Sequence, residues 1–243
     1  MISIFLGNVG SGKTASAVYD LLTNNCDDNV FTNIELNTKI PHVKDLKPEM
    51  IFKLEWDEKK QKDMPVSVNK DFWRNLDGST SVILDEVHTL LNARKPGAKV
   101  NIIMTDWLAL IRRVLGSVES GEGHLVMISQ IQRRIDVIAR EMANVVKYHT
   151  CHYTKTCPRC RYSWPESSAT PEPVWKCPLC GSKGIKKHHH IVEVHCFTNI
   201  SDFNLWDAMG FKTWYDQYYI MDIENVFNMY NTKSWDNLLS EYY

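Results

Sequence analysis

The chain lacks any long apolar run. None of its segments approaches the roughly 20 consecutive apolar residues that cross a bilayer. The first residues already belong to an expected strand, which leaves no room for a signal peptide. We therefore expect a cytoplasmic protein with no membrane segment of its own. Repeats and extended low-complexity tracts are missing too, and 44% hydrophobic with 23% charged residues in 243 excludes a mainly disordered chain.

An excess of charge of one sign is also missing. The 28 Lys and Arg residues are balanced by 29 Asp and Glu residues, giving a formal net charge of -1. The chain as a whole is therefore not a basic nucleic-acid-binding protein. Any contact with DNA has to come from local clusters, such as Arg112 with Arg113 or Lys186 with Lys187.

The chain does contain, near its start, the segment FLGNVGSGKT at residues 5–14. It fits the phosphate-binding pattern G-x-x-x-x-G-K-[ST] (Walker A), between an apolar run and a segment with helical spacing. In such a loop, backbone N–H groups and a helix N-terminus surround a β-phosphate, Lys13 contacts β- and γ-phosphate oxygens, and Thr14 holds Mg²⁺. The expected ATP-binding residues are Gly7, Asn8, Val9, Gly10, Ser11, Gly12, Lys13 and Thr14.

A second segment, VILDEVH, ends a buried run in two acids (Walker B). An acid at the end of a strand beside the phosphate-binding loop completes the Mg²⁺ shell, so we assign Asp85 to nucleotide and magnesium together with Thr14. Glu86 is placed to orient or deprotonate an attacking water, which predicts hydrolysis and not transfer to an acceptor. Two interpretations of His88 stay open: a structural role in the following loop, or a catalytic one.

Further polar candidates follow a third buried run, LVMISQ. Gln130 is expected to contact the γ-phosphate or the water, the alternative being a solvent-facing amide. With Lys13 and Glu86 it completes the expected catalytic set. The segment RRIDVIAREMAN is expected to form a helix, on which an arginine either acts in trans on the ATP of a neighbouring subunit or is solvated. The candidates are Arg133, Arg134 and Arg140.

Apolar runs alternate with helical patterns along the chain. This order predicts an α/β fold of the P-loop NTPase type, with a mostly parallel sheet flanked by helices on both faces. Residues 37–69 show only a weak pattern and are expected to form surface loops with one short strand near residues 50–56. A helix is expected at 105–116. The aromatic tail from residue 201 has no clear period and is expected to pack on the main domain.

Four of the seven cysteines form two Cys-x-x-Cys pairs. Their spacing, C-x₂-C-x₁₆-C-x₂-C, is typical of a structural four-thiolate zinc site. We expect residues 154–186 to be a zinc-ribbon insertion in a P-loop ATPase domain made of residues 1–153 and 187–243. The expected zinc ligands are Cys157, Cys160, Cys177 and Cys180.

Two roles of this module stay open. It either replaces a core that some 30 residues cannot build, or it forms a platform that contacts DNA or a partner subunit through charged and aromatic side chains. The three consecutive histidines at 188–190 are interpreted as a solvated strand start and not as spare ligands. The residues of the platform would be Arg159, Arg161, Tyr162, Trp164, Trp175 and Lys176.

The order of these motifs resembles the zonular occludens toxin (Zot) family, which includes the assembly ATPase of filamentous phages within the FtsK/HerA superfamily of translocating ATPases. The resemblance implies a viral or mobile-element ATPase that moves DNA in genome packaging or virion assembly and extrusion. It also implies a homo-oligomer, with a viral structural or membrane protein as a second candidate partner. The segments that carry it are GNVGSGKT, VFTNIEL, VILDEVHTLLNAR, WLALIRRVLG, LVMISQ with RRIDVIARE, and VFNMYNTKS.

The chain departs from the phage assembly proteins, since it has no membrane segment after the ATPase region and carries a cysteine module foreign to the family pattern. Two other functions stay open. One is a noncatalytic ATP-dependent switch or scaffold. The other is a nucleoside monophosphate kinase with a zinc lid, which needs an acceptor segment of the Asp-Gly-Phe-Pro-Arg type that this sequence lacks.

Overall fold

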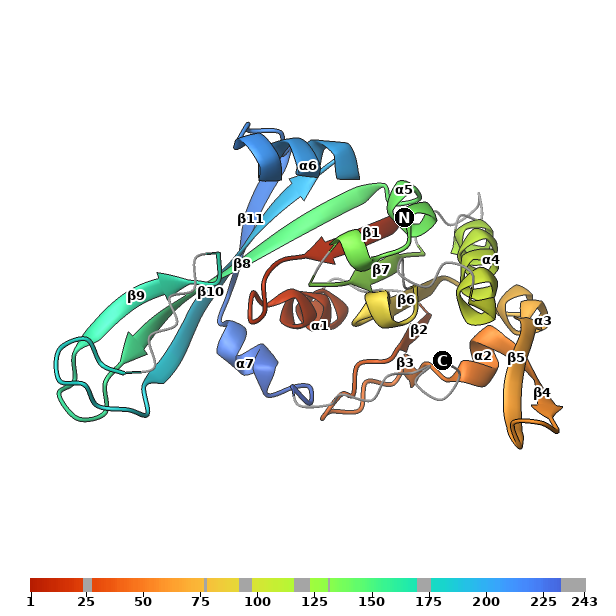
Figure 1. Cartoon of the computed structure of the whole chain (residues 1–243), viewed down its shortest axis with the longest axis horizontal. Coiled ribbons are helices and arrows are strands. Elements are labelled where there is room, and N and C mark those ends of the chain that lie inside the picture. Colours follow the sequence, from red (N-terminus) through yellow and green to blue (C-terminus); the bar gives the residue numbers. More distant parts are fainter. Residues whose placement is uncertain are drawn as a thin grey trace.

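The computed structural model describes residues 1–23, 28–76, 78–91, 98–115, 123–130, 132–169 and 176–232. Within these residues, the centre is a nine-stranded sheet in the order β11-β10-β8-β1-β7-β6-β2-β3, with β9 paired to β8 (Figure 1). Its strands are β1 (Ile2–Leu6), β2 (Asn29–Thr32), β3 (Val43–Asp45), β6 (Thr80–Leu84), β7 (Leu125–Ile128), β8 (Val145–Thr156), β9 (Ser163–Ser167), β10 (Lys186–Phe197) and β11 (Asp216–Met221).

The sheet is parallel from β8 to β3 and antiparallel at its other edge. β1 pairs in parallel with both β7 and β8, whereas β10 runs antiparallel to β8 and to β11. The predicted α/β class with a mostly parallel sheet is therefore confirmed. Because the carboxyl ends of parallel strands meet at one edge, the loops after β1, β6 and β7 lie close together.

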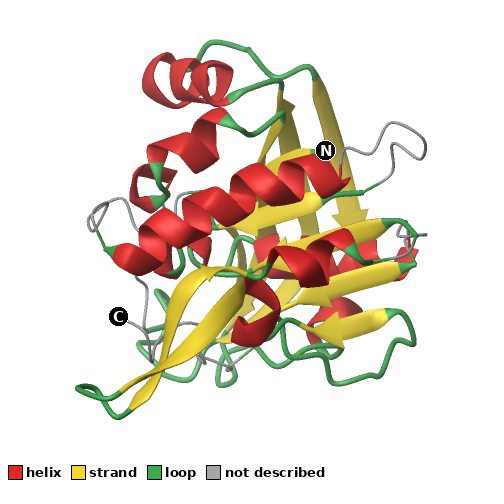
Figure 2. Cartoon of the chain, turned by 90° about the vertical axis from the view of Figure 1, so that its right-hand side faces the viewer, coloured by secondary structure: helices red, strands yellow, loops and turns green. Residues whose placement is uncertain are grey.

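Hydrophobic side chains on the two faces of the sheet pack under different helices. Along β1, Ile2, Ile4 and Leu6 join one core cluster, whereas Phe5 points to the other cluster, as strand alternation requires. The first cluster includes residues of α3 (Lys70–Arg74), α4 (Lys99–Leu115) and α6 (Ile200–Met209). The second includes residues of α1 (Lys13–Thr23) and α7 (Ile223–Phe227). Helices thus cover both faces, and Figure 2 looks onto the α4 side.

Helix α4 begins six residues before the expected start at residue 105. Val100, Ile103 and Met104 continue the apolar spacing that leads to Trp107, and all four side chains are buried. The helical face is therefore longer than the segment from which we predicted it. The expected terminal residue, Gly116, lies outside the described residues.

The prediction of a single helix at 133–144 is wrong. Residues Gln132–Arg134 form a 3₁₀ turn, and α5 covers only Val137–Glu141. Asp136 causes the break, because its carboxylate accepts a 2.9 Å hydrogen bond from the backbone N–H of Ile138 and so caps a new helix. Arg133 and Arg134 therefore lie on the 3₁₀ turn, and only Arg140 lies on an α-helix.

Two regions hold more regular structure than expected. The weakly patterned stretch at 37–69 contains β3, α2 (Pro48–Ile51) and a hairpin of β4 (Phe52–Asp57) with β5 (Lys62–Val68). The aromatic tail contains α6, β11 and α7, and β11 pairs with β10 over six residues. No helix in the described part of the chain has the length and apolar character that crossing a membrane requires.

Strands β8 and β10 form a long hairpin that projects from the body, on the left in Figure 1. β9 folds back on β8, and the cysteine turns lie at the far end. We call the projecting part, residues 152–169 and 176–191, the cysteine arm. The cysteine segment therefore lies between two long paired strands.

Candidate nucleotide and metal sites

The loop between β1 and α1 can be built only with glycine at two positions. Gly7 has φ of 146°, and a Cβ there would lie 2.5 Å from the carbonyl oxygen of His149. Gly12 has φ of 87°, and its Cβ would lie 2.4 Å from Cγ2 of Val192. The loop therefore rests directly on β8 and β10, with its backbone in a conformation that L side chains avoid.

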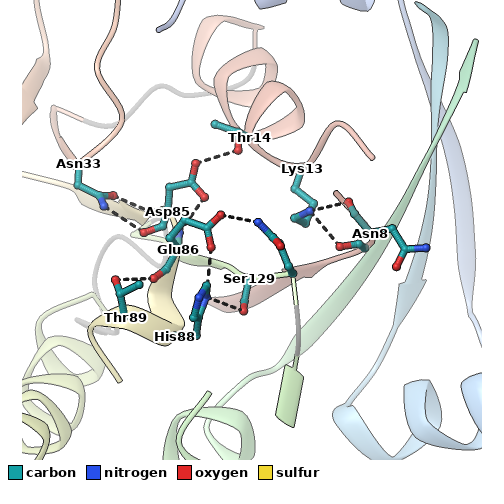
Figure 3. A network of polar contacts seen from close by, with 11 residues as sticks. Asn8, Lys13, Thr14, Asn33, Asp85, Glu86, His88, Thr89 and Ser129 are labelled. Carbon is teal, nitrogen blue, oxygen red and sulfur yellow. Dashed lines mark hydrogen bonds and ion pairs between the residues drawn. The ribbon is translucent and has the colours of Figure 1, made fainter. Parts of the chain in front are cut away.

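Lys13 lies inside this loop. Its side chain is buried, and its Nζ donates hydrogen bonds of 2.9 Å to the carbonyl oxygens of Gly7 and Asn8 (Figure 3). Burial lowers the pKa of Lys13 to about 8, although the carboxylates of Asp85 and Glu86 oppose this shift. The amine is thus held where an anion in the loop would restore much of its lost solvation.

Thr14 and Asp85 meet across the top of the sheet. The Thr14 hydroxyl donates a 2.8 Å hydrogen bond to Oδ2 of Asp85. Burial raises the pKa of Asp85, while the hydrogen bonds from Thr14 and from the Glu86 backbone act in the opposite direction. A half-buried carboxyl beside a hydroxyl is a pair of oxygen ligands suited to Mg²⁺, which would hold Asp85 ionised.

Asn33, which the sequence did not single out, fixes the backbone of Asp85. Its side-chain oxygen accepts a 2.7 Å hydrogen bond from the Asp85 N–H, and its amide donates one of 3.0 Å to the Asp85 carbonyl. Asn33 directly follows β2, the neighbour of β6. The only signal in the sequence was a polar residue after an apolar strand.

Glu86 adopts a left-handed backbone conformation, with φ of 50° and ψ of 42°. Its carbonyl accepts a 2.8 Å hydrogen bond from the hydroxyl of Thr89, in the 3₁₀ turn that follows. Gln130 donates a 2.8 Å hydrogen bond to Oε1 of Glu86, and Nδ1 of His88 lies 3.1 Å from Oε2. Both carboxylate oxygens therefore have a polar neighbour. A conformation this rare outside glycine is typical of functional positions.

His88 is held between Glu86 and Ser129, whose Oγ lies 3.4 Å from Nδ1 of His88. Burial lowers the pKa of His88; the Glu86 carboxylate opposes this shift and Arg134 adds to it. The ring is therefore neutral at pH 7. Of the two interpretations, the geometry favours a structural one, since His88 contacts the acid that is the stronger catalytic candidate.

The three candidate arginines differ in their surroundings. Arg133 is exposed, whereas Arg134 and Arg140 are half-buried. In the described structure, the Nε atoms of Arg134 and Arg140 are buried without a hydrogen-bond partner. Arg134 is close enough to His88 to lower its pKa. Arg134 thus lies on the Glu86 side of this chain's own site.

The four cysteines converge at the tip of the cysteine arm. Their Sγ atoms all lie within 4.8 Å of one another, and two of the distances, Cys157 to Cys180 and Cys160 to Cys177, are 3.6 Å. Ligands about 2.3 Å from a tetrahedral Zn²⁺ would be about 3.8 Å apart. The set therefore fits a four-thiolate metal ion. Cys151 and Cys196 are separate buried thiols.

The model of the family described as zonular occludens toxin (Zot) matches residues 1–176. The chain belongs to the zonular occludens toxin family. The match includes the glycine loop, Asp85, Glu86 and Gln130, and it ends within the cysteine arm, so that Cys177 and Cys180 lie beyond it. No curated protein matches this Zot-family chain significantly.

Among solved structures, the chain is similar to the N-terminal domain of zonular occludens toxin from Neisseria meningitidis. That similarity has 16% identity, covers 95% of this chain and 98% of the other, and has a TM-score of 0.49. The genome packaging NTPase B204 from Sulfolobus turreted icosahedral virus 2, in complex with sulfate, is 11% identical over 60% of this chain and 72% of its own, with a TM-score of 0.34. The Zot assignment rests on the sequence match, and the fold on the strand order.

The cysteine arm touches the phosphate-binding loop of this Zot-family chain. The Asn8 amide donates a 2.9 Å hydrogen bond to the carbonyl of Ser168, which directly follows β9. Ser168 is itself fixed to β8, because its hydroxyl accepts a 2.8 Å hydrogen bond from the Cys151 N–H. No pattern in the sequence indicates this contact, because 160 residues separate Asn8 from Ser168.

Proposed function

We propose that this chain is an ATPase that couples ATP hydrolysis to the movement of DNA during viral genome packaging or virion assembly. The observation that carries the proposal is the 2.8 Å hydrogen bond between Thr14 of the glycine loop and Asp85 at the end of β6, with Glu86 as the next residue. A loop that only bound phosphate would not need a half-buried carboxyl and a second acid beside it.

The residues present fit ATP with Mg²⁺. The glycine loop has three positive-φ positions, Gly7, Gly10 and Gly12, and leads into the N-terminus of α1, where backbone N–H groups can bind phosphates. We assign the hydroxyl of Thr14 and the carboxylate of Asp85 to Mg²⁺. Bound Mg²⁺ would supply positive charge to the phosphates.

In the proposed reaction, Glu86 holds a water molecule and accepts its proton as the water oxygen bonds to the γ-phosphorus. The bond from phosphorus to the oxygen of ADP breaks, and the proton later leaves with phosphate or solvent. Lys13 stabilises the charge on the phosphate oxygens. Gln130 contacts the γ-phosphate or the water once it moves from Glu86.

Assembly and cargo belong to the same proposal. The resemblance of the motif order to phage assembly ATPases supports a homo-oligomer that acts on DNA, with an arginine reaching the site of a neighbour, in the host cytoplasm. Arg133 and Arg140 are the candidates that no contact within the described chain ties to its own site. We further propose that residues 154–186 are a zinc-ribbon insertion in the ATPase domain, with structural Zn²⁺ on the four cysteines.

The contacts of the Glu86 carboxylate favour one alternative function, a nucleotide-dependent switch or scaffold that hydrolyses ATP slowly. Both carboxylate oxygens have polar neighbours, Gln130 and His88, which a bound water would have to displace or share. In a switch this arrangement would persist with nucleotide bound. In a motor it would break when DNA or a neighbouring subunit joins the site.

The test measures steady-state ATP turnover with and without duplex DNA, beside sedimentation in ATP. A motor predicts that turnover rises at least severalfold with DNA and that subunits associate in ATP. Slow turnover that responds to neither DNA nor protein concentration would support the switch instead. Formation of two ADP from ATP and AMP would point to the kinase.

A further inference from the structure

The tip of the cysteine arm has basic side chains on its surface and lacks exposed acidic ones in its described residues. The arm holds eight Lys, Arg, Asp and Glu residues in its described stretches, and two of them, Lys155 and Glu166, form a buried ion pair of 2.7 Å. The other six are all basic and all exposed: Arg159, Arg161, Lys176, Lys183, Lys186 and Lys187.

This basic tip contrasts with the rest of the molecule. The whole chain has a formal net charge of -1, so the remainder of the chain is acidic overall. Four thiolates on one Zn²⁺ carry a net charge of about -2, which six basic side chains exceed. The tip therefore keeps a positive potential that would attract a polyanion.

Arg161 occupies a position where the matching turn has glycine. In the first cysteine turn the Cys157 carbonyl accepts a 3.1 Å hydrogen bond from the N–H of Arg161, and in the second the Cys177 carbonyl accepts one of 2.9 Å from that of Gly181. The donating residue of each turn has a positive φ, 62° at Arg161 and 68° at Gly181. An arginine here costs about 1 kcal/mol of conformational energy relative to glycine, which indicates a use for its side chain.

An aromatic pair lies beside these basic side chains. Tyr162 is 43% exposed, and its ring stacks on that of Trp164 with 5.6 Å between centroids and 23° between planes. The Trp164 indole N–H donates a 3.1 Å hydrogen bond to Glu166, which is fixed by Lys155. The pair is thus held in place with one tyrosine face open. Trp175, which we also expected here, lies outside the described residues.

We propose that the tip of the cysteine arm binds nucleic acid, with the exposed lysines and arginines on the phosphates and a base stacked on Tyr162. Phosphate contacts supply affinity, and stacking on an aromatic ring favours a strand whose bases are open. The arm projects from the body (Figure 1), so a strand can reach its far end from several sides. That the nucleic acid is the cargo of the motor rests on the proposed function; the binding surface does not.

Arm and nucleotide site are joined by the hydrogen bond from Asn8 to Ser168. Ser168 directly follows β9, which leads from the tip back to the glycine loop. The arm is therefore in direct contact with the backbone that would surround the phosphates.

The experiment measures fluorescence anisotropy of a labelled 30-nucleotide single strand, and of the same sequence as duplex, against full-length protein loaded with zinc. The test variant is Lys183→Gln/Lys186→Gln/Lys187→Gln. The matched control removes three exposed lysines from the β4–β5 hairpin, at the opposite end of the molecule in Figure 1: Lys59→Gln/Lys60→Gln/Lys62→Gln. Zinc content confirms that the tip is intact in each.

We expect the tip variant to bind at least tenfold more weakly and the hairpin variant to bind as wild type. The slope of log affinity against log salt should become about 2 less steep for the single strand, since each lost phosphate contact contributes about 0.7. Tyr162→Ala should weaken the binding of the single strand about fivefold or more, and the binding of the duplex by a smaller factor.

Equal losses of DNA affinity in both triple variants, or no loss in either, would overturn the proposal. So would binding of anionic phospholipid vesicles without binding of DNA. ATP turnover with and without DNA, measured on wild-type protein from the same preparation, separates the proposed function from the proposed binding surface. DNA binding at the tip without ATP turnover would contradict only the proposed motor function. ATP turnover without tip-dependent DNA binding would contradict only the proposed binding surface.

Discussion

Thr14 and Asp85 are 71 residues apart in sequence, yet the hydroxyl of one donates a 2.8 Å hydrogen bond to the carboxylate of the other. This contact joins the start of α1 to the end of β6 and brings two oxygen ligands together. It also explains how a half-buried Asp85 is tolerated, because the hydroxyl and a metal ion would each favour its charged form.

Thr14→Val therefore removes one proposed metal ligand and leaves Asp85 without its hydroxyl partner. ATP affinity should fall at least tenfold in Mg²⁺ and change little in EDTA, as measured by titration with a fluorescent ATP analogue. Thr14→Ser keeps the hydroxyl and should retain most of the affinity. Equal losses in Mg²⁺ and in EDTA would argue against a metal at this pair.

Lys13 makes ATP binding depend on pH. Burial lowers its pKa from 10.5 to about 8 in the free protein, so the amine loses its charge as the pH rises through about 8. Phosphates would raise the pKa again, so binding takes up a proton above pH 8 and affinity should fall by up to about tenfold per pH unit. Lys13→Arg stays charged and should show no such decline. If the ATP affinity of the wild type does not change between pH 7 and pH 9.5, this role of Lys13 is contradicted.

Gly12→Ala should destabilise the protein more than Gly10→Ala. Both glycines have positive φ, but a Cβ at Gly10 meets nothing within 4 Å, whereas one at Gly12 lies 2.4 Å from Val192. We expect about 1 kcal/mol for Gly10→Ala and about 2 kcal/mol or more beyond that for Gly12→Ala, from urea unfolding. Gly12→Ala/Val192→Ala should recover part of the difference, and purely additive losses would contradict the contact.

Removal of zinc should loosen the cysteine arm and leave the parallel sheet folded. The described residues of the tip include few large buried side chains, so a zinc ion on the four cysteines would be its main crosslink. A strong chelator, or Cys157→Ser, should abolish one equivalent of bound zinc and open the arm to limited proteolysis, while the rest of the chain stays protected. Cys196→Ala removes a thiol outside the cluster and should keep its zinc. Protease resistance of the arm after chelation would contradict a structural metal.

The parts of the site that follow local rules could be predicted from the sequence. The glycine loop depends on spacing within eight residues, and Asp85 with Glu86 ends an unmistakable apolar strand. Asn33 was missed because its partner Asp85 is 52 residues away. Contacts of this kind depend on strand order, which the sequence did not give. That order places β2 beside β6.

The wrong predictions about the fold also have physical causes. At 133–144 the apolar spacing favoured a helix, but Asp136 hydrogen-bonds the N–H of Ile138 more readily than it continues one. In the tail, β11 is an edge strand in which Tyr219 and Met221 are 52% and 60% exposed. With large apolar side chains on its exposed face, the strand shows no alternation of apolar and polar residues. The cysteine turns were predictable because metal ligands leave a fixed spacing.

The most direct test of the account concerns Glu86. Glu86→Gln keeps the shape of the side chain and can still accept a hydrogen bond from Gln130, but it cannot accept the proton of a water. Single-turnover hydrolysis of bound ATP, measured beside ATP affinity, should slow by about 100-fold or more while the affinity stays within about threefold of wild type. Hydrolysis at the wild-type rate in Glu86→Gln would contradict the account.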